Sequence, residues 1–270
     1  MPEGDTILRT ARTLDRALAG QAVTRFDSVL PKLERVDYDT PLAGRIVDRV
    51  EARGKWVVMY FSGDLILLTH MRMSGSWHIY RPGENWQVAR GRMRMVVETA
   101  EMVAVGFDVP VAEFHTAASL ARREGFTGLG PDLLAADFDA EKARANLGAR
   151  GEVEVGLALL DQRVMAGIGN AFKSEIAFAC GVNPFRKVAA LSGAQLAELV
   201  AVARKYLLAN VTEGSGHFRR TTGSLDREEN LWVYRRTGKP CRRCGAAIQA
   251  GRHVADGRVS FWCPECQRAS

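Results

Sequence analysis

The sequence has no long run of apolar residues. Hydrophobic residues make up 47% of its 270 residues, but none of their runs approaches the roughly 20 residues that a membrane-spanning helix needs. The beginning also lacks the basic region of a secretion signal, because Glu3 and Asp5 stand there. We therefore expect no interaction with a membrane and predict a cytoplasmic protein.

Cysteine is scarce outside one segment. Four of the five cysteines form two C-x2-C pairs, Cys241 with Cys244 and Cys263 with Cys266, and the fifth, Cys180, stands alone in a helical stretch. This distribution argues against a disulfide framework and fits a reducing compartment. Two such pairs, eighteen residues apart, are typical of four thiolates around one tetrahedral zinc ion. We predict one structural zinc on two facing β-hairpins, and in Cys180 a buried, inert thiol.

An excess of positive charge is missing from residues 1–230, in which Lys and Arg balance Asp and Glu. Residues 231–270 hold eight Lys and Arg against two acids, so their net charge of +6 equals that of the whole chain. This concentration predicts a phosphate-binding element at the zinc site. Arg258 stands between the cysteine pairs, at the expected tip of the second hairpin, where its guanidinium is well suited to hold a phosphate.

The spacing of apolar residues predicts an α+β fold. A helix is expected over residues 3–18, because Ile7, Ala11, Leu14 and Leu18 recur at helical spacing. Short β-rich runs follow at 47–50, 55–61, 64–69, 77–80, 92–98 and 102–107. The run over 56–61 is apolar on both faces, as in the core of a sandwich or barrel. We predict a β-sandwich with the first helix packed against it.

The second half of the chain has the pattern of a helical domain. Helices are expected over 153–165, 171–180 and 192–209, with a turn at Gly167-Ile168-Gly169, and a mobile loop is expected over the Gly-, Thr- and Arg-rich residues 211–230. The predicted division is a sandwich domain over 1–114, connecting helices over 115–150, the helical domain with its loop over 151–230, and a zinc finger over 231–270.

Pro2 and Glu3 are the candidate catalytic pair. Removal of Met1 ahead of the small Pro2 frees a secondary amine, and an α-amino group has a pKa of roughly 7.7–8.0. Such an amine can attack C1′ of a sugar to form an iminium, with Glu3 as the proton shuttle. The same two residues also suit a plain helix start, with proline in the first turn and an acid facing the helix dipole. On these residues alone, the helix start is the simpler interpretation.

Four other residues are candidate ligands, each with a simpler alternative. Asn170, after the glycine turn, either helps to hold a phosphate or caps a helix. Lys55 opens a strand after a glycine, and a solvated charge is the common role there. His70 ends a strand and Met73 follows it in a loop, where Met73 on its own is best explained as core filler.

The order of these motifs identifies a resemblance. Met1-Pro2-Glu3-Gly4, Arg53-Gly54-Lys55, His70 with Met73-Ser74-Gly75-Ser76, residues 160–162 running into 166–170, and the four-cysteine ribbon with Arg258 occur in one order. From Pro2 to Gln267 the chain closely resembles the formamidopyrimidine-DNA glycosylase and endonuclease VIII family of base-excision repair enzymes. The resemblance implies an N-terminal β-sandwich, a helix–two-turn–helix domain and a zinc finger.

The resemblance also implies roles for single residues. Pro2 is then the nucleophile and Glu3 the general acid/base of a combined glycosylase and abasic-site lyase that cuts the strand by β,δ-elimination. Lys55, His70, Asn170 and Arg258 hold DNA phosphates, and Met73 enters the space of the extruded nucleotide. The implied partner is damaged double-stranded DNA, bound by a monomer in the bacterial cytosol or nucleoid.

The lesion class rests on smaller differences. The family branch that acts on oxidised purines carries an Arg and a Phe after the strand that ends near Phe107, and residues 107–111 here do not show them. The start Pro2-Glu3-Gly4 also departs from that branch, whereas residues 73–75 are closer to it. We expect oxidised pyrimidines as substrates. The alternatives are an oxidised-purine glycosylase, a catalytically silent damaged-DNA-binding protein, and an RNA-associated zinc-ribbon protein, which would not need Pro2.

Overall fold

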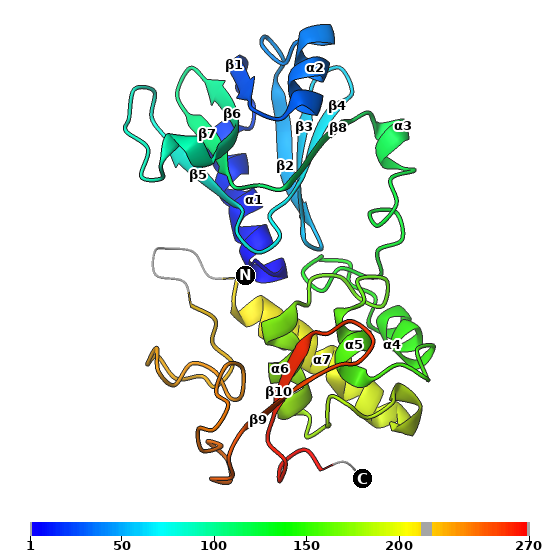
Figure 1. The fold of residues 1–270 in the computed structure, drawn as a ribbon. Coiled ribbons are helices and arrows are strands. Elements are labelled where there is room, and N and C mark those ends of the chain that lie inside the picture. Colours follow the sequence, from blue (N-terminus) through cyan, green and yellow to red (C-terminus); the bar gives the residue numbers. More distant parts are fainter. Residues whose placement is uncertain (1, 212–217, 269–270) are drawn as a thin grey trace. The chain divides into compact units, whose positions relative to one another are not determined.

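The chain folds into two compact units, one over residues 1–127 and one over 128–270 (Figure 1). The computed structural model describes residues 2–211 and 218–268. Within these ranges no helix is long and apolar enough to cross a membrane. Of the loop expected over 211–230, residues 212–217 lie outside the described ranges, and 218–230 form neither helix nor strand. The finer division into four parts stays a prediction.

The first unit is a sandwich of two four-stranded antiparallel sheets, as predicted. One sheet has the order β1-β6-β7-β5 and the other the order β2-β3-β4-β8. The strands of the first sheet are β1 (Val23–Ser28), β5 (Ser76–Tyr80), β6 (Met93–Thr99) and β7 (Val103–Phe107). Those of the second are β2 (Val47–Arg53), β3 (Trp56–Phe61), β4 (Leu65–His70) and β8 (Val111–His115). A short 3-10 turn, η1 (Arg90–Arg92), precedes β6.

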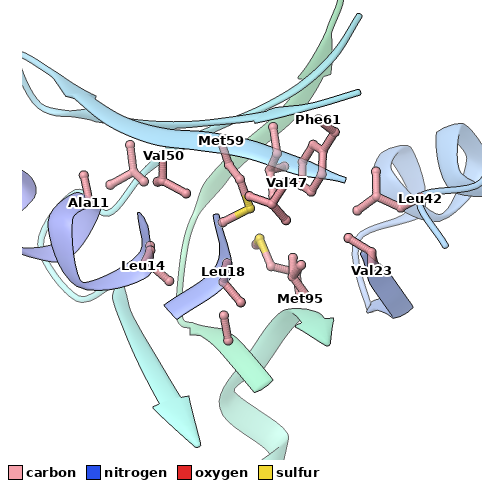
Figure 2. Close-up of a cluster of buried hydrophobic side chains, with 14 of the residues drawn as sticks. Ala11, Leu14, Leu18, Val23, Leu42, Val47, Val50, Met59, Phe61 and Met95 are labelled. Carbon is pink, nitrogen blue, oxygen red and sulfur yellow. The ribbon is translucent and has the colours of Figure 1, made fainter. Parts of the chain in front are cut away.

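Helix α1 (Gly4–Leu18) contributes to the core of this sandwich, which confirms the predicted amphipathic helix. All four residues of the predicted stripe are buried, and Leu14 is 1% and Leu18 0% exposed. Figure 2 shows Leu14 and Leu18 beside Met59 of β3 and Met95 of β6, so the helix fills the space between the sheets. This burial fixes α1 on the sandwich, and with it the two residues that precede the helix.

Three elements of the first unit were not predicted. Strand β1 exposes most of its middle residues, helix α2 (Pro31–Asp39) buries only Leu33, and β8 follows Pro110 in a segment with little alternation. Local patterns fail here because neighbouring elements supply the burial: β1 pairs with β6, β8 pairs with β4, and α2 packs against both β1 and β8. The short helix α3 (Ala117–Leu120) also belongs to this unit.

The second unit is helical, with α4 (Ala140–Gly148), α5 (Val155–Leu160), α6 (Asn170–Ala179), η2 (Val188–Ala190) and α7 (Gly193–Ala209). The helix predicted over 153–165 is therefore too long. It ends at Leu160 because the Asp161 carboxylate accepts the Arg163 N–H at 3.0 Å and the Gln162 amide donates to the Leu160 carbonyl at 2.8 Å. Two turns then lead into α6.

The cysteine-rich end of the unit contains one β-hairpin, formed by β9 (Gln249–Arg252) and β10 (Val259–Trp262). The first cysteine pair lies in a shorter antiparallel turn, in which Pro240 and Ala247 form an isolated bridge and the Cys241 N–H donates to the Ala246 carbonyl at 2.7 Å. Of the two predicted hairpins, one therefore has regular strands and the other is a tight turn. The α+β fold as a whole is confirmed.

Candidate active site and metal centre

The first turn of α1 presents a buried carboxylate beside Pro2. Glu3 is the N-cap residue of α1, and its side chain is 0% exposed and makes no capping hydrogen bond. Its carbonyl accepts the Ile7 N–H at 3.0 Å. The carboxylate therefore does not cap the helix by a hydrogen bond, and it lies at the positive end of the helix dipole. This buried position suits both the dipole interaction and the proton shuttle that the sequence predicts for Glu3.

Lys55 lies in a tight turn at the end of the second sheet. Arg53 ends β2 and Trp56 begins β3, which leaves Gly54 and Lys55 as the two turn residues. Gly54 has φ +58°, a conformation that glycine adopts without strain. Lys55 thus stands in the turn just ahead of the strand that it was expected to open, and it is half-buried.

His70 is neutral and keeps one hydrogen-bond donor. Burial is the main reason that its pKa falls from 6.5 to about 4. The positive charges of Arg72, Lys55 and Arg123 contribute to the same shift. The ring Nδ1 accepts the Arg72 N–H at 3.0 Å, so the proton of the neutral ring is on Nε2. His70 can therefore donate a hydrogen bond without carrying charge.

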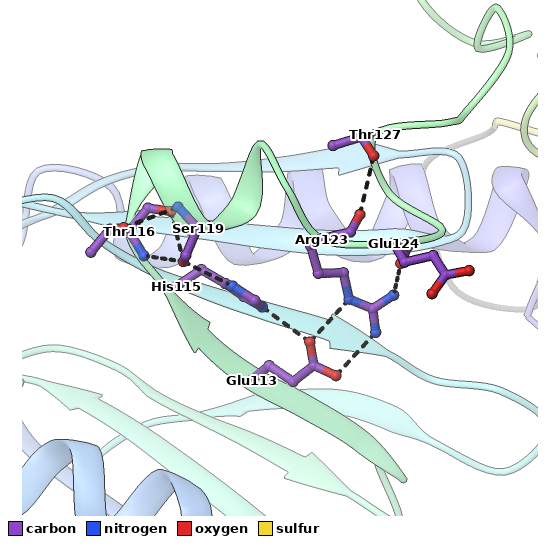
Figure 3. Close-up of polar contacts among 7 residues, drawn as sticks. All are labelled: Glu113, His115, Thr116, Ser119, Arg123, Glu124 and Thr127. Atoms are coloured by element: carbon purple, nitrogen blue, oxygen red, sulfur yellow. Dashed lines mark hydrogen bonds and ion pairs between the residues drawn. The ribbon is translucent and has the colours of Figure 1, made fainter.

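A wall of packed side chains backs His70. Its ring meets the edge of Trp56 at 4.8 Å between centroids. The Arg123 guanidinium lies 4.4 Å from the centroid of the Trp56 ring and donates to both oxygens of Glu113 at 3.0 Å. Figure 3 shows this paired contact, together with His115, which links Glu113 to a turn at the start of α3. The sequence analysis did not predict these residues. The only indication of them was Trp56, the aromatic residue directly after Lys55.

Met73 is held at the surface by a tight turn between β4 and β5. The Gly75 N–H donates to the Met71 carbonyl at 2.8 Å, and Arg72 has φ +50°. A Cβ added at Gly75 would lie 2.7 Å from the Met71 oxygen, so only glycine fits there. The Met73 side chain is 68% exposed. The core-filler interpretation is wrong for this residue.

These features gather at one end of the first unit. Trp56 and His70 touch across β3 and β4, and the charge of Lys55 reaches His70. In Figure 1 the first turn of α1 points toward the same lower end of the sandwich as the turn between β2 and β3. The start of α1 therefore lies at the same end of the sandwich as the turn that holds Lys55.

In the second unit, Asn170 begins α6 after the predicted glycine turn. The Gln162 side chain organises this turn, since its amide donates to the Ile168 carbonyl at 3.1 Å and its oxygen accepts the Gly167 N–H at 3.0 Å. The Asn170 Oδ1 atom is buried, and no group in the described part of the chain forms a hydrogen bond with it. The residue therefore does not cap α6 with that oxygen. A phosphate accepts hydrogen bonds only, so Asn170 can hold one through its Nδ2–H group or together with the N–H groups at the start of α6.

Arg258 precedes β10 in the loop of the hairpin, as expected. Its side chain is 54% exposed, and its Nε lies 3.3 Å from the Asp256 carboxylate. The Asp256 carboxylate also accepts the Arg258 N–H at 2.9 Å. The guanidinium is thus oriented at its base and open to solvent, and it can exchange Asp256 for a phosphate.

The four predicted cysteines form one metal-binding cluster. All four sulfur atoms lie within 4.8 Å of one another. The Cys241 and Cys266 sulfurs are 3.9 Å apart, and those of Cys244 and Cys263 are 3.4 Å apart. Tetrahedral zinc–sulfur bonds of about 2.3 Å place sulfurs about 3.8 Å apart. The cluster therefore fits a single tetrahedral ion.

Backbone N–H groups favour the thiolate of Cys241, whereas burial and the neighbouring thiols raise the pKa of Cys263 and of Cys266. Burial also acts to raise the pKa of Cys241, but N–H groups of residues 243 and 244, together with the neighbouring thiols, lower this pKa to about 7. A further N–H contact joins Cys266 to the Cys263 sulfur at 3.5 Å. Cys180 lies outside the cluster, and burial raises the pKa of its thiol to about 12, in keeping with the inert role predicted for it.

A buried carboxylate that the sequence analysis missed supports the segment before the cluster. Glu175 of α6 is 0% exposed and accepts N–H groups from Trp232 at 2.8 Å, Val233 at 2.9 Å and Tyr234 at 2.8 Å. The Thr221 hydroxyl donates to it as well. The available signal was an acidic residue in a mostly apolar helix, beside Lys173 and Ser174.

The order of domains now decides the family. Residues 1–108 match the formamidopyrimidine-DNA glycosylase N-terminal domain, and residues 129–221 match the formamidopyrimidine-DNA glycosylase H2TH domain. The chain belongs to the formamidopyrimidine-DNA glycosylase family. The resemblance predicted from the motifs is confirmed, and the chain is an enzyme of this family rather than an RNA-associated zinc-ribbon protein.

Relatives within the family agree over the whole length. The chain is 42% identical to "Probable endonuclease 8 2" of Streptomyces coelicolor, over 99% of this chain and 94% of the relative. It is 39% identical to the "DNA-(apurinic or apyrimidinic site) lyase Nei2" of Mycolicibacterium smegmatis, over the full length of both. A solved structure of Lactococcus lactis Fpg, in complex with DNA that contains an abasic site, matches with a TM-score of 0.83 and 23% identity over 98% of this chain and 99% of that chain. The match to the Lactococcus lactis structure supports the fold of the present chain.

Proposed function

We propose that this protein is a bifunctional DNA glycosylase and abasic-site lyase that removes oxidised bases from double-stranded DNA. The observation that carries the proposal is the wholly buried Glu3 directly after Pro2 at the start of α1. Retention of both residues speaks against a catalytically silent DNA-binding protein. The relatives named as endonuclease 8 and as an abasic-site lyase support the same activity. As these relatives are bacterial, we place the enzyme, as a monomer, in the bacterial cytosol or nucleoid.

The chemistry begins at the amine of Pro2, once Met1 has been removed. The nitrogen attacks C1′, the bond from C1′ to the base breaks, and Glu3 delivers the proton that the departing base takes. The nitrogen then loses its own proton, the C1′–O4′ bond breaks with delivery of a proton to O4′, and an iminium forms at C1′ of the opened deoxyribose. This iminium acidifies the C2′ proton. Loss of that proton expels the 3′ phosphate by β-elimination, and a second elimination expels the 5′ phosphate. The product is a one-nucleotide gap with phosphate at both ends.

DNA phosphates are bound by side chains of both units. Lys55 supplies a positive charge and His70 a neutral Nε2–H donor in the first unit, while Asn170 and Arg258 serve in the second. Extrusion of a base costs a few kcal/mol, and Met73, exposed on its rigid turn, fills the space that the nucleotide leaves. One structural zinc, held by Cys241, Cys244, Cys263 and Cys266, keeps the Arg258 hairpin folded.

We assign oxidised pyrimidines as the preferred lesions. The missing Arg and Phe after Phe107 and the endonuclease 8 names of the relatives favour them. The segment Met73-Ser74-Gly75 favours the purine branch instead. A panel of duplexes with single lesions distinguishes the two: thymine glycol and 5-hydroxyuracil are cut faster than 8-oxoguanine opposite cytosine. A preference for 8-oxoguanine moves the enzyme to the purine branch.

Borohydride trapping tests the mechanism. Because Pro2 is a secondary amine, its intermediate is a cation that borohydride reduces to a stable protein–DNA adduct. A residue added ahead of Pro2 converts the amine to an amide and abolishes the adduct. Glu3→Gln slows base removal far more than cutting at a preformed abasic site, where no base has to leave. Trapping that maps to Lys55 by mass spectrometry overturns the assignment of Pro2.

A further inference from the structure

One histidine of the second unit has no part in the proposed chemistry, yet it is wholly buried. His253 follows β9 and is 0% exposed. Its Nδ1 lies 2.6 Å from Glu154 Oε2, and its Nε2 lies 2.6 Å from Ser260 Oγ. Ser260 is also wholly buried. The imidazole ring is therefore held by hydrogen bonds on both sides.

The backbone of His253 closes the loop that carries Arg258. The His253 N–H donates to the Arg258 carbonyl at 2.9 Å, and the Gly257 N–H donates to the His253 carbonyl at 2.9 Å. Both ends of the loop thus meet at the histidine. A fixed position for the ring consequently fixes the backbone from which the Arg258 guanidinium extends.

The space around the imidazole is shaped to fit it. A Cβ added at Gly156 of α5 would lie 2.8 Å from both Cε1 and Nε2 of His253, so glycine allows this close approach. The Phe185 ring packs on the other side, 4.6 Å from the histidine ring between centroids, and it also meets Trp262 of β10 at 5.0 Å. Such close packing leaves the ring a single position.

Helix α6 holds the second strand of the same hairpin. The Lys173 ammonium donates to the Val259 carbonyl at 3.1 Å, and the Ser174 hydroxyl accepts the Phe261 N–H at 3.3 Å. This helix begins at Asn170. The hairpin is therefore attached to α5 through the histidine and to α6 through β10, which fixes its loop relative to the start of α6.

We propose that His253 is a positioning residue, which through Glu154 and Ser260 holds Arg258 in the orientation that binds a DNA phosphate. The inference rests on the proposed function, which gives Arg258 its phosphate. A loop free to move would lose entropy on binding, and the buried ring removes that cost in advance.

The test is a double-mutant cycle with His253→Ala, Arg258→Ala and the double variant. Affinity for a duplex with a tetrahydrofuran abasic analogue is measured over a range of salt concentrations, and zinc is counted in each variant. We expect His253→Ala to keep one zinc, to bind about tenfold more weakly, and to lose about one phosphate contact from the salt slope, as Arg258→Ala does. In the double variant the second change adds little, because both act through one contact.

If His253→Ala loses its zinc, Glu154→Ala takes its place in the double-mutant cycle with Arg258→Ala. Its matched control is Glu152→Ala, which removes the same charge from an exposed pair with Lys187 that lies 2.7 Å apart. We expect Glu154→Ala to weaken binding and the control not to. If a variant retains its zinc and the losses of binding free energy from Arg258→Ala and from His253→Ala or Glu154→Ala are fully additive, the inference is overturned. The proposed function then stays intact. Wild-type affinity of Arg258→Ala overturns the inference and the phosphate-binding role of Arg258, whereas the proposed glycosylase and lyase activity, which rests on Pro2 and Glu3, is unaffected.

Discussion

At the scale of single residues, environment decides which of the sequence's candidates can act. The cluster of four cysteines was predictable from residue type and spacing, and the proposed roles of Pro2 and Glu3 rest on the same kind of evidence. The neutral state of His70 was not, because it follows from burial and from charges that meet only in the fold. Met73 illustrates the same limit, since its exposure depends on the turn that Gly75 allows.

The lowered pKa of His70 predicts a specific pH dependence. The pKa is 6.5 in the unfolded chain and about 4 in the fold, so between these values the unfolded chain binds more protons. The contribution of His70 to the free energy of unfolding is fully present above pH 6.5 and is lost as the pH falls toward 4. It amounts to about 3 kcal/mol of the free energy of unfolding.

We therefore expect His70→Gln to lose less stability than the wild type between pH 7 and pH 4. NMR titration of the His70 ring, assigned by its absence in the variant, gives the pKa directly. A midpoint near 6.5 contradicts the burial and charge argument. The same spectra report the tautomer, which we expect to carry its proton on Nε2 above pH 5.

At the scale of elements, turns set by a few hydrogen bonds determine where the candidate residues stand. The helix predicted over 153–165 ends early because the Asp161 side chain accepts an N–H of the following turn and the Gln162 side chain donates to the carbonyl of Leu160, the last residue of the helix. Hydrophobic periodicity continues through such a turn and does not reveal it. Strong periodic elements such as α1 were predicted well, whereas β1, α2 and β8 depend on partners far away in the sequence.

The turn after β4 offers a test at this scale. Gly75→Ala places a Cβ 2.7 Å from the Met71 carbonyl oxygen, so the turn has to open and Met73 moves. We expect a loss of about 1–3 kcal/mol of stability and a larger loss of cutting at lesions in duplex DNA than at unpaired abasic sites. Gly91→Ala is the matched control, because nothing lies within 4 Å of its added Cβ. Equal activity of the two variants contradicts a role for the turn.

At the scale of the whole molecule, the metal cluster and the helical unit share buried side chains. Cys241 and Cys263 lie in one apolar cluster with Phe178 of α6 and Val233. The Trp232 ring stacks on Phe178 at 5.5 Å between centroids. The spacing of the four cysteines predicted the cluster, but not its packing on α6, because Phe178 and Val233 are distant from the cysteine pairs in sequence and ordinary in type.

The structural effect of removing the metal should therefore extend beyond the cysteines. We expect Cys244→Ala to lose the zinc, to change the fluorescence of Trp232, and to abolish DNA binding because the Arg258 hairpin loses its fold. The β-sheet signal in far-ultraviolet circular dichroism should persist, since the first unit has a core of its own. Cys180→Ala is the control: this thiol stands outside the cluster, so zinc content and DNA affinity should stay at the wild-type level. Retention of one zinc and full affinity in Cys244→Ala contradicts the four-cysteine site, whereas loss of the sheet signal as well shows that the first unit depends on the second.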